Sequence, residues 1–271
     1  MFDTVIEMLS YPFMTRAFLV GSLVALCSAL LGVSLVLKRY SMIGDGLSHV
    51  GFGAMAIAAA MNAAPLTVAI PVVIVAAILL LRISGNAKIK GDAAIALIST
   101  TSLAVGVMVI SLTTGMNTDV YNYMFGSILA MSAEDVKLSF VLSVFVLILF
   151  IVFYHKIFAI TFDETFARAT GVKAGVYNTL IAVLTAVTIV LGMRMMGALL
   201  ISSLIIFPAL TSMRVCRTFK SVIINAAVIS VVCLIAGVTL SYVAATPAGA
   251  SVVLANLVMM VLYTVVGVVK N

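Results

Sequence analysis

An aspartate and a histidine spaced four residues apart are the most informative pair in this sequence. Asp45 and His49 lie within residues 44–53, which read GDGLSHVGFG. At this spacing on a helix, two side chains share one face and their Cβ atoms lie about 6 Å apart. A carboxylate oxygen and an imidazole nitrogen on one face suit a divalent transition metal. The pair therefore predicts a metal site with Asp45 and His49 as ligands.

The surroundings of this pair are apolar enough to place it inside a membrane. The chain is 64% hydrophobic and 9% charged, and its mean hydropathy is +1.33. A carboxylate in the centre of a bilayer costs about 2.5–3.5 kcal/mol on insertion scales, so it usually marks a path for substrate or ions. Packing contacts with each other or with a neighbouring helix are the alternative. Four glycines within residues 44–53 favour a transport site, because transporters build sites on broken or closely packed helices.

Apolar runs of spanning length fill almost the whole chain. We therefore expect an all-α fold, a polytopic transmembrane helical bundle of eight to nine spans that forms one integral membrane domain over residues 1–271. The run with the Asp-His pair is the least regular because of its glycines. The expected runs are 13–37, 42–61, 64–82, 92–112, 135–154, 176–193, 195–213, 221–242 and 248–269.

The basic residues predict the orientation of these runs. With an outside N-terminus and one crossing per run, all but three of the 15 Lys and Arg residues fall on the cytoplasmic side, as the positive-inside rule requires. The exceptions are Arg16, Lys137 and Arg194. The C-terminus is then cytoplasmic. The net charge of +6 reflects these cytoplasmic loops and does not indicate nucleic-acid binding.

Nothing in the loops indicates an enzyme. No loop is long enough for a soluble catalytic domain, and the sequence has no GxxxxGK(S/T) phosphate-binding loop. Any ATP hydrolysis is therefore expected on a separate chain. We predict a transport subunit without a permanently bound cofactor.

The longest predicted cytoplasmic segment, residues 155–175, contains the signals of a short capped helix. Thr161 or Asp163 would cap its start, Glu164 suits its first turn and Gly171 would end it. Such a helix is predicted to connect the spans to something on the cytoplasmic side.

One face of this helix would be apolar. Phe162, Phe166 and Ala169 or Thr170 would form an i, i+4, i+7 stripe that fits a groove on another protein. A connector lying on the membrane is the alternative, and a basic face would favour it. The charges are mixed instead, with Arg168 close to two acidic residues, so we favour a protein partner.

A proline lies inside the predicted run 195–213. Pro208 removes one helical hydrogen bond and is expected to kink the span, which makes it a candidate for gating; a static kink is the alternative. Ser202 and Ser203 would either satisfy freed carbonyls or offer an oxygen to a passing metal. We favour the first role.

Five segments in the same order resemble the ABC-3 metal permeases, the membrane subunits of bacterial zinc, manganese and iron ABC importers. The resemblance extends from about residue 35 to residue 215. The chain departs from the family after His49, where VGFG replaces AVLPG, and after Glu164, where Thr-Phe replaces the Ala-Ala of many ABC permeases. The segments are 37–49 (LKRYSMIGDGLSH), 90–95 (KGDAAI), 125–130 (FGSILA), 162–172 (FDETFARATGV) and 197–209 (GALLISSLIIFPA).

The resemblance implies a multi-pass protein of the bacterial cytoplasmic membrane, in contact with lipid. It implies a homodimer docked on a cytoplasmic ABC ATPase dimer and supplied by an extracytoplasmic metal-binding lipoprotein. Asp45 and His49 correspond to the family's intramembrane metal ligands. Zinc suits imidazole and manganese suits carboxylate, so the pair leaves Mn²⁺ or Zn²⁺ open as cargo, with iron as a further option. The residues implied in ATPase coupling are Phe162, Asp163, Glu164, Ala167, Arg168 and Gly171.

Two other classes of function stay open at this point. A proton- or ion-coupled secondary metal carrier would use Asp45 and His49 as a proton relay and would work without an ATPase. A structural membrane scaffold would make no use of them. Co-purification of an ATPase excludes the secondary carrier, and metal uptake that survives Asp45→Asn and His49→Ala would indicate a scaffold.

Overall fold

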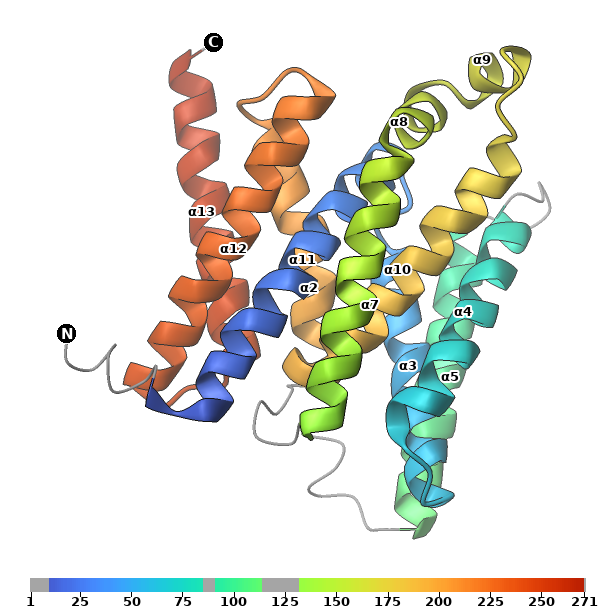
Figure 1. The fold of residues 1–271 in the computed structure, drawn as a ribbon, viewed down its shortest axis with the longest axis vertical. Coiled ribbons are helices and arrows are strands. Elements are labelled where there is room, and N and C mark those ends of the chain that lie inside the picture. Colours follow the sequence, from blue (N-terminus) through green and yellow to red (C-terminus); the bar gives the residue numbers. More distant parts are fainter. Residues whose placement is uncertain (1–9, 85–90, 114–131, 271) are drawn as a thin grey trace.

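The structure is a computed structural model that describes residues 10–84, 91–113 and 132–270. Throughout these ranges the chain forms helices joined by turns, and they contain no strand, as predicted for an all-α fold (Figure 1). The segment 125–130 and the lysines Lys88 and Lys90 lie outside the described residues. The helices are α2 (Pro12–Leu37), α3 (Ile43–Ala60), α4 (Pro65–Ser84), α5 (Gly91–Thr113), α7 (Ala133–Val152), α8 (Tyr154–Phe162), α9 (Glu164–Ala169), α10 (Ala174–Met196), α11 (Ala198–Met213), α12 (Phe219–Ala244) and α13 (Ala248–Lys270).

Eight of the described helices are long and apolar enough to cross a membrane, namely α2 to α5, α7, α10, α12 and α13. The helix α11 is shorter. Its 16 residues extend about 24 Å at 1.5 Å per residue, less than the roughly 30 Å of a hydrocarbon core. The described residues thus contain eight helices of spanning length and the shorter α11, in line with the predicted eight to nine spans. The described chain begins and ends at opposite ends of the bundle, so the number of crossings is odd and α11 also passes from one end to the other (Figure 1).

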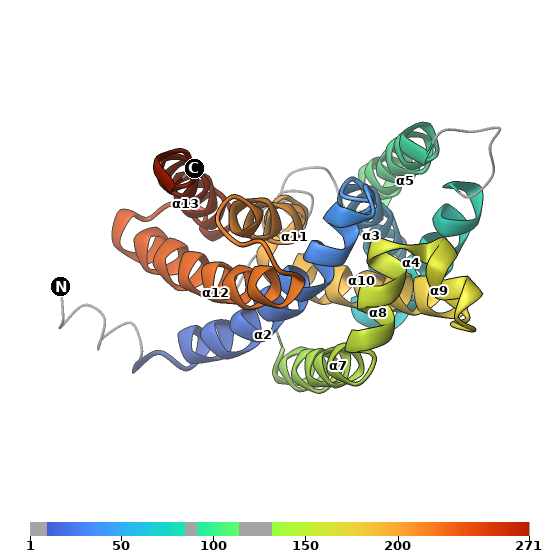
Figure 2. The same cartoon turned by 90° about the horizontal axis from the view of Figure 1, so that it is seen from above.

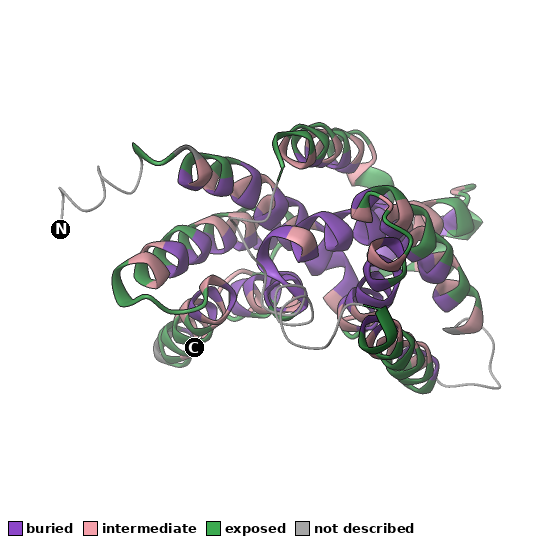
Figure 3. Cartoon of the chain, turned by 90° about the horizontal axis from the view of Figure 1, so that it is seen from below, coloured by how far each residue is buried: buried purple, intermediate pink, exposed green. Residues whose placement is uncertain are grey.

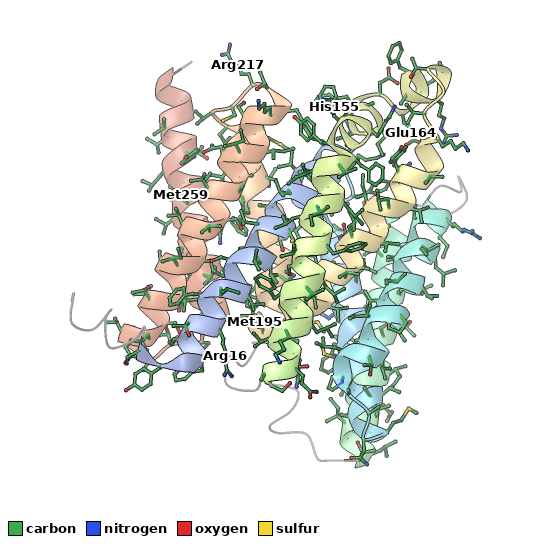
Figure 4. The ribbon with its side chains drawn as sticks, in the orientation of Figure 1. Arg16, His155, Glu164, Met195, Arg217 and Met259 are labelled. Carbon is green, nitrogen blue, oxygen red and sulfur yellow. The ribbon has the colours of Figure 1, made fainter. Side chains whose placement is uncertain are left out.

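The two ends of the bundle differ in charge. The C-terminus lies at the end that carries α8 and α9, and the described chain begins at the opposite end (Figure 1). Arg217 and His155 lie at the first end and Arg16 at the second (Figure 4). We call the end with α8, α9 and Arg217 the basic end. This separation agrees with the predicted outside N-terminus and cytoplasmic C-terminus.

The centre of the bundle is formed by α2, α3 and α10, which are the most buried of the spans. In the view from below, buried residues occupy the middle and exposed ones the outer helices (Figure 3). The outer helices α5, α7 and α13 are the least buried. Their exposed side chains are largely apolar, as in Leu254, Val258 and Leu262 of α13. Lipid tails are as apolar as leucine, so such surfaces suit a bilayer.

The glycines of α3 allow close packing without breaking the helix. The helix runs continuously from Ile43 to Ala60. A Cβ added at Gly53 would lie 2.7 Å from the carbonyl oxygen of Ser102 in α5, and one at Gly106 would lie 3.0 Å from the Cα of Gly53. The two backbones thus meet through small residues, a common mode of helix packing in membranes.

A single residue joins α10 to α11. Gly197 has φ 85° and ψ 162°, and the positive φ suits glycine because it has no Cβ. The chain turns sharply there, and α11 then packs against α2, α3, α12 and α13. This turn places α11 beside α3, the helix with the Asp-His pair, as the view from above shows (Figure 2).

Candidate metal site and coupling network

The helix α3 positions Asp45 and His49 on one face. Asp45 lies in the first turn, where the positive end of the helix dipole favours a carboxylate. His49 follows one turn deeper along the same helix. Asp45 Oδ2 and His49 Nε2 are 3.8 Å apart, so the predicted sharing of a face is confirmed.

The separation of these two atoms suits a shared metal ion. Zinc lies about 2.0–2.2 Å from nitrogen and oxygen ligands, so two atoms bound to one ion are at most about 4.2–4.4 Å apart. The observed 3.8 Å is within that limit. It is also longer than a normal hydrogen bond, so the carboxylate and the imidazole do not already satisfy each other.

A hydroxyl from α11 approaches the same carboxylate. Ser202 Oγ lies 3.5 Å from Asp45 Oδ1 and 3.2 Å from the carbonyl oxygen of Ala198. The Oγ of Ser203 donates instead to the carbonyl of Leu200 at 2.8 Å. Ser202 thus belongs to the surroundings of the Asp-His pair, whereas Ser203 is a buried packing residue.

These hydrogen bonds correct one prediction about the proline. Pro208 frees the carbonyl of Leu204, four residues earlier. Ser202 and Ser203 bond to other carbonyls, so the role that we favoured for them is wrong. The helix α11 continues through Pro208 to Met213. A gating role for Pro208 stays a prediction.

The Asp-His pair lies on an accessible face of the chain. The side chain of Asp45 is 45% exposed and that of His49 is 21% exposed. The helices α5 and α11 lie on either side of α3 (Figure 2). Both helices carry exposed apolar side chains, such as Leu97 on α5 and Leu199 on α11. Among the described residues, no group of three or more His, Cys, Asp or Glu side chains could hold a metal.

A second cluster of charges lies at the basic end and joins α2 to α8, α9 and α10. Lys38 Nζ donates to Asn178 Oδ1 at 2.6 Å, to the carbonyl of Ile160 at 3.1 Å and to Glu164 Oε2 at 3.3 Å. Asn178 Nδ2 donates to the same Glu164 oxygen at 3.0 Å. Arg168 donates to Glu164 Oε1 at 2.6 Å. We call these five residues the coupling network.

The electrostatics of the coupling network favour its charged form. Burial raises the pKa of Glu164, but the hydrogen bonds from Asn178 and Arg168 and the charge of Lys38 outweigh burial and lower the pKa to about 2. Burial lowers the pKa of Lys38, and the carboxylate of Glu164 opposes that change. Lys38 ends α2 and leads into the turn that precedes α3, so the network is close in sequence to the Asp-His helix.

The family of the chain follows from comparison with known proteins. The model of the ABC 3 transport family matches residues 10–267. The chain belongs to the ABC 3 transport family. It is therefore a metal permease of an ABC importer, a transport subunit and a multi-pass membrane protein.

Several members of this family are similar to the chain over nearly their whole length. The zinc uptake membrane protein ZnuB of Haemophilus influenzae is 30% identical over 91% of this chain and 94% of its own. The manganese transport membrane protein MntC of Halalkalibacterium halodurans is 27% identical over 92% and 85%. The solved structure of PsaBC from Streptococcus pneumoniae, in complex with a Fab, is 26% identical and matches 96% of this chain and 94% of that chain with a TM-score of 0.86.

The permease forms two short helices, not one, in the predicted coupling segment. Asp163 lies between α8 and α9 and caps α9, because its Oδ1 accepts from the backbone N–H of Phe166 at 2.8 Å. Thr161 belongs to α8 and donates to the carbonyl of Ile157, so it is not the cap. Gly171 has φ 86° just after α9, as a helix-ending glycine does.

The break between the two helices also changes the predicted apolar stripe. Phe162 ends α8, and its ring packs against those of Phe158 and Phe219. Phe166 is 65% exposed on α9, whereas Ala167 is buried. The predicted stripe is therefore interrupted at Asp163, although Phe162 is also 58% exposed. On α9 itself, Phe166 presents the large exposed ring.

The coupling network is the part of the site that sequence reasoning missed. Glu164 and Arg168 were predicted to take part in coupling, but Lys38 and Asn178 were not connected with them. Lys38 and Glu164 are 126 residues apart, and nothing in the local sequence pairs them. The one available signal was a lysine at the end of an apolar run that precedes the Asp-His segment.

Proposed function

We propose that this permease passes Mn²⁺ or Zn²⁺ through the membrane by way of Asp45 and His49. The observation that carries the proposal is the 3.8 Å separation of an exposed carboxylate oxygen and an imidazole nitrogen on one helical face. The relative ZnuB is a zinc uptake protein and the relative MntC is a manganese transport protein, which supports this choice of cargo. Ser202 offers a third oxygen beside the pair.

A second copy of the chain would complete the site. A carboxylate that is 45% exposed on a membrane-spanning helix is costly against hydrocarbon, so its face requires a cover or a water-filled path. Divalent metals usually take four to six ligands. A twofold interface places the same patch of both copies together and would bring two Asp-His pairs near one axis.

The dimer can be tested by cross-linking in membranes. Met42 is exposed three residues before Asp45, whereas Val141 is exposed on α7, which lies on the other side of the bundle (Figure 2). Met42→Cys should give a cross-linked dimer with a short reagent, and Val141→Cys should not. Cross-linking of both variants to the same extent would contradict the proposed interface.

The coupling network would transmit the movement of a cytoplasmic ATPase dimer. The exposed ring of Phe166 is the docking feature on α9, and Glu164 two residues earlier is held by Lys38, Arg168 and Asn178. A displacement of α9 would then reach the turn before α3 as a rigid-body movement. Metal would be delivered from the opposite end by an extracytoplasmic binding protein.

Metal accumulation, measured element by element in cells, tests the proposed function. Asp45→Asn and His49→Gln should abolish uptake of one metal while the amount of permease in the membrane is unchanged. Glu134→Gln and His155→Gln are the matched controls, because both residues are exposed and lie on other helices. Uptake that survives both site variants would refute the proposal. Uptake that persists when the partner ATPase is inactivated would favour a secondary carrier.

A further inference from the structure

A groove lies between α12 and α13 at the basic end. It has a volume of about 600 Å³, and its walls include Ile224, Asn225 and Val228 from α12 and Tyr263 and Val266 from α13. The wall is largely apolar. Its polar pair is satisfied internally, because Tyr263 Oη donates to Asn225 Oδ1 at 3.2 Å.

The groove continues into a second hollow with different chemistry. That hollow has a volume of about 780 Å³ and shares Val215, Cys216 and Ser221 with the first. Arg214 and Arg217, both exposed, lie on its wall. The first hollow is thus an apolar trough along two spanning helices, and it opens into the second hollow, a basic mouth. We call the trough and the mouth together the α12–α13 groove.

Acidic residues are absent from the sequence that forms this groove. No Asp or Glu follows Glu164, although seven Lys and Arg residues do. Lys220, in the first turn of α12, adds to the charge of the two arginines. The start of α12 contributes the positive end of its helix dipole near the same mouth.

We propose that the α12–α13 groove binds an anionic phospholipid. The phosphate would lie against Arg214 and Arg217, and one acyl chain would follow the trough past Ile224 and Val228. Basic pockets between spanning helices on the cytoplasmic side bind anionic head groups for this reason. The mouth is at the basic end, where the head groups of that leaflet lie.

Charge and shape favour this occupant over two others. A second copy of the permease would present the same basic surface, and like charges would oppose an interface there. Inorganic phosphate would use the mouth and leave the apolar trough unfilled. A phospholipid satisfies both parts of the groove at once.

Native mass spectrometry of the purified full-length permease can test the proposal. Phosphatidylglycerol and phosphatidylethanolamine with the same acyl chains are added in separate titrations. We expect phosphatidylglycerol to be retained at least tenfold more tightly. Arg214→Gln or Arg217→Gln should weaken its retention about fivefold each.

Three further measurements complete the lipid-binding experiment. Arg82→Gln, an exposed arginine at the end of α4, should leave phosphatidylglycerol binding unchanged. Val228→Phe should weaken lipid binding by filling the trough, and an excess of inorganic phosphate should fail to displace the lipid. Thermal unfolding in phosphatidylethanolamine confirms that each variant is folded. Equal binding of the two lipids, full displacement by phosphate, or unchanged binding when Arg214→Gln and Arg217→Gln are combined in one variant would overturn the proposal.

Discussion

The Asp-His pair and the coupling network are both small clusters of charged side chains, yet the chain satisfies them to different degrees. Glu164 receives hydrogen bonds from Lys38, Arg168 and Asn178 at 2.6–3.3 Å. Asp45 has two polar neighbours at 3.5 and 3.8 Å and stays 45% exposed. The coupling network makes its hydrogen bonds within the chain and so holds helices together. The Asp-His pair has no close hydrogen-bond partner for its carboxylate, which is therefore available to a ligand.

From this comparison, we expect substitutions in the Asp-His pair to have the largest effect. The effect should be on transport and not on stability. Asp45→Asn and His49→Gln should reduce metal uptake by roughly 100-fold or more, because loss of even an outer partner of a metal ligand costs about 10–100-fold. Their free energies of unfolding should change by less than about 0.5 kcal/mol, as at other sites without close contacts. A fall in thermal stability comparable to the loss of transport would make the pair a structural contact instead.

Removal of the ammonium group in the coupling network should affect stability and transport together. Lys38→Met leaves the Asn178 oxygen and the Ile160 carbonyl without their donor, which costs about 1–3 kcal/mol. Uptake of metal per ATP hydrolysed should also fall, because α9 would no longer be held to the turn before α3. Thermal unfolding and the ratio of transport to hydrolysis measure the two effects.

The exposed Lys156 on α8 provides the control for this variant. Lys156→Met should leave both the unfolding midpoint and the transport ratio unchanged. If Lys38→Met lowers stability but keeps the full ratio, the network is structural and has no part in transmission.

A third variant tests how tightly α3, the helix with the Asp-His pair, packs against α5. Gly53→Ala forces a methyl group against the Ser102 carbonyl and should cost about 1–3 kcal/mol through overpacking. Gly175→Ala, at a helical glycine with open space around it, should be neutral or stabilise by up to about 1 kcal/mol. Thermal unfolding of the two variants compares them directly. Equal effects would show that the contact between α3 and α5 is not tight.

The effect confined to acidic conditions is the pH dependence of the coupling network. The pKa of Glu164 is lowered to about 2, and an unfolded glutamate titrates near about 4.3. Glu164 therefore stabilises the fold fully above about pH 5, and this contribution is lost as the pH falls towards 2. The difference in stability between the natural chain and Glu164→Gln should be constant from pH 5 to 7 and shrink below. A difference that already shrinks between pH 7 and 6 would contradict the assignment.

The features that depend on local sequence were predictable. Spanning helices follow from apolar runs, and the glycines in residues 44–53 indicated a closely packed helix, although not that α5 is its neighbour. The common face of Asp45 and His49 follows from helical periodicity alone. The order of motifs likewise indicated the family that the match to residues 10–267 established.

The remaining features depend on contacts that periodicity does not encode. The run 195–213 was predicted from its apolarity, but the one-residue turn at Gly197 depends on a backbone angle that the sequence does not reveal. The short helix that Asp163 caps was predicted and is confirmed as α9. The helix α8 before it was not predicted, because residues 155–160 carried no cap signal of their own. The partners of Lys38 come from α8, α9 and α10, and several other acidic residues were equally compatible with it from the sequence.

Through the single-residue joint at Gly197, α10 connects the coupling network with the surroundings of the Asp-His pair. Asn178, near one end of α10, belongs to the coupling network, and the other end leads directly into the helix of Ser202. With 23 residues, α10 is about 34 Å long at 1.5 Å per residue. From Asn178 to Met196 the rise is about 27 Å, so a tilt of about 7° around Asn178 would displace the far end by about 3 Å. That displacement is close to the 3.5 Å between Ser202 and Asp45, so a small rotation at the basic end would be enough to separate these two side chains.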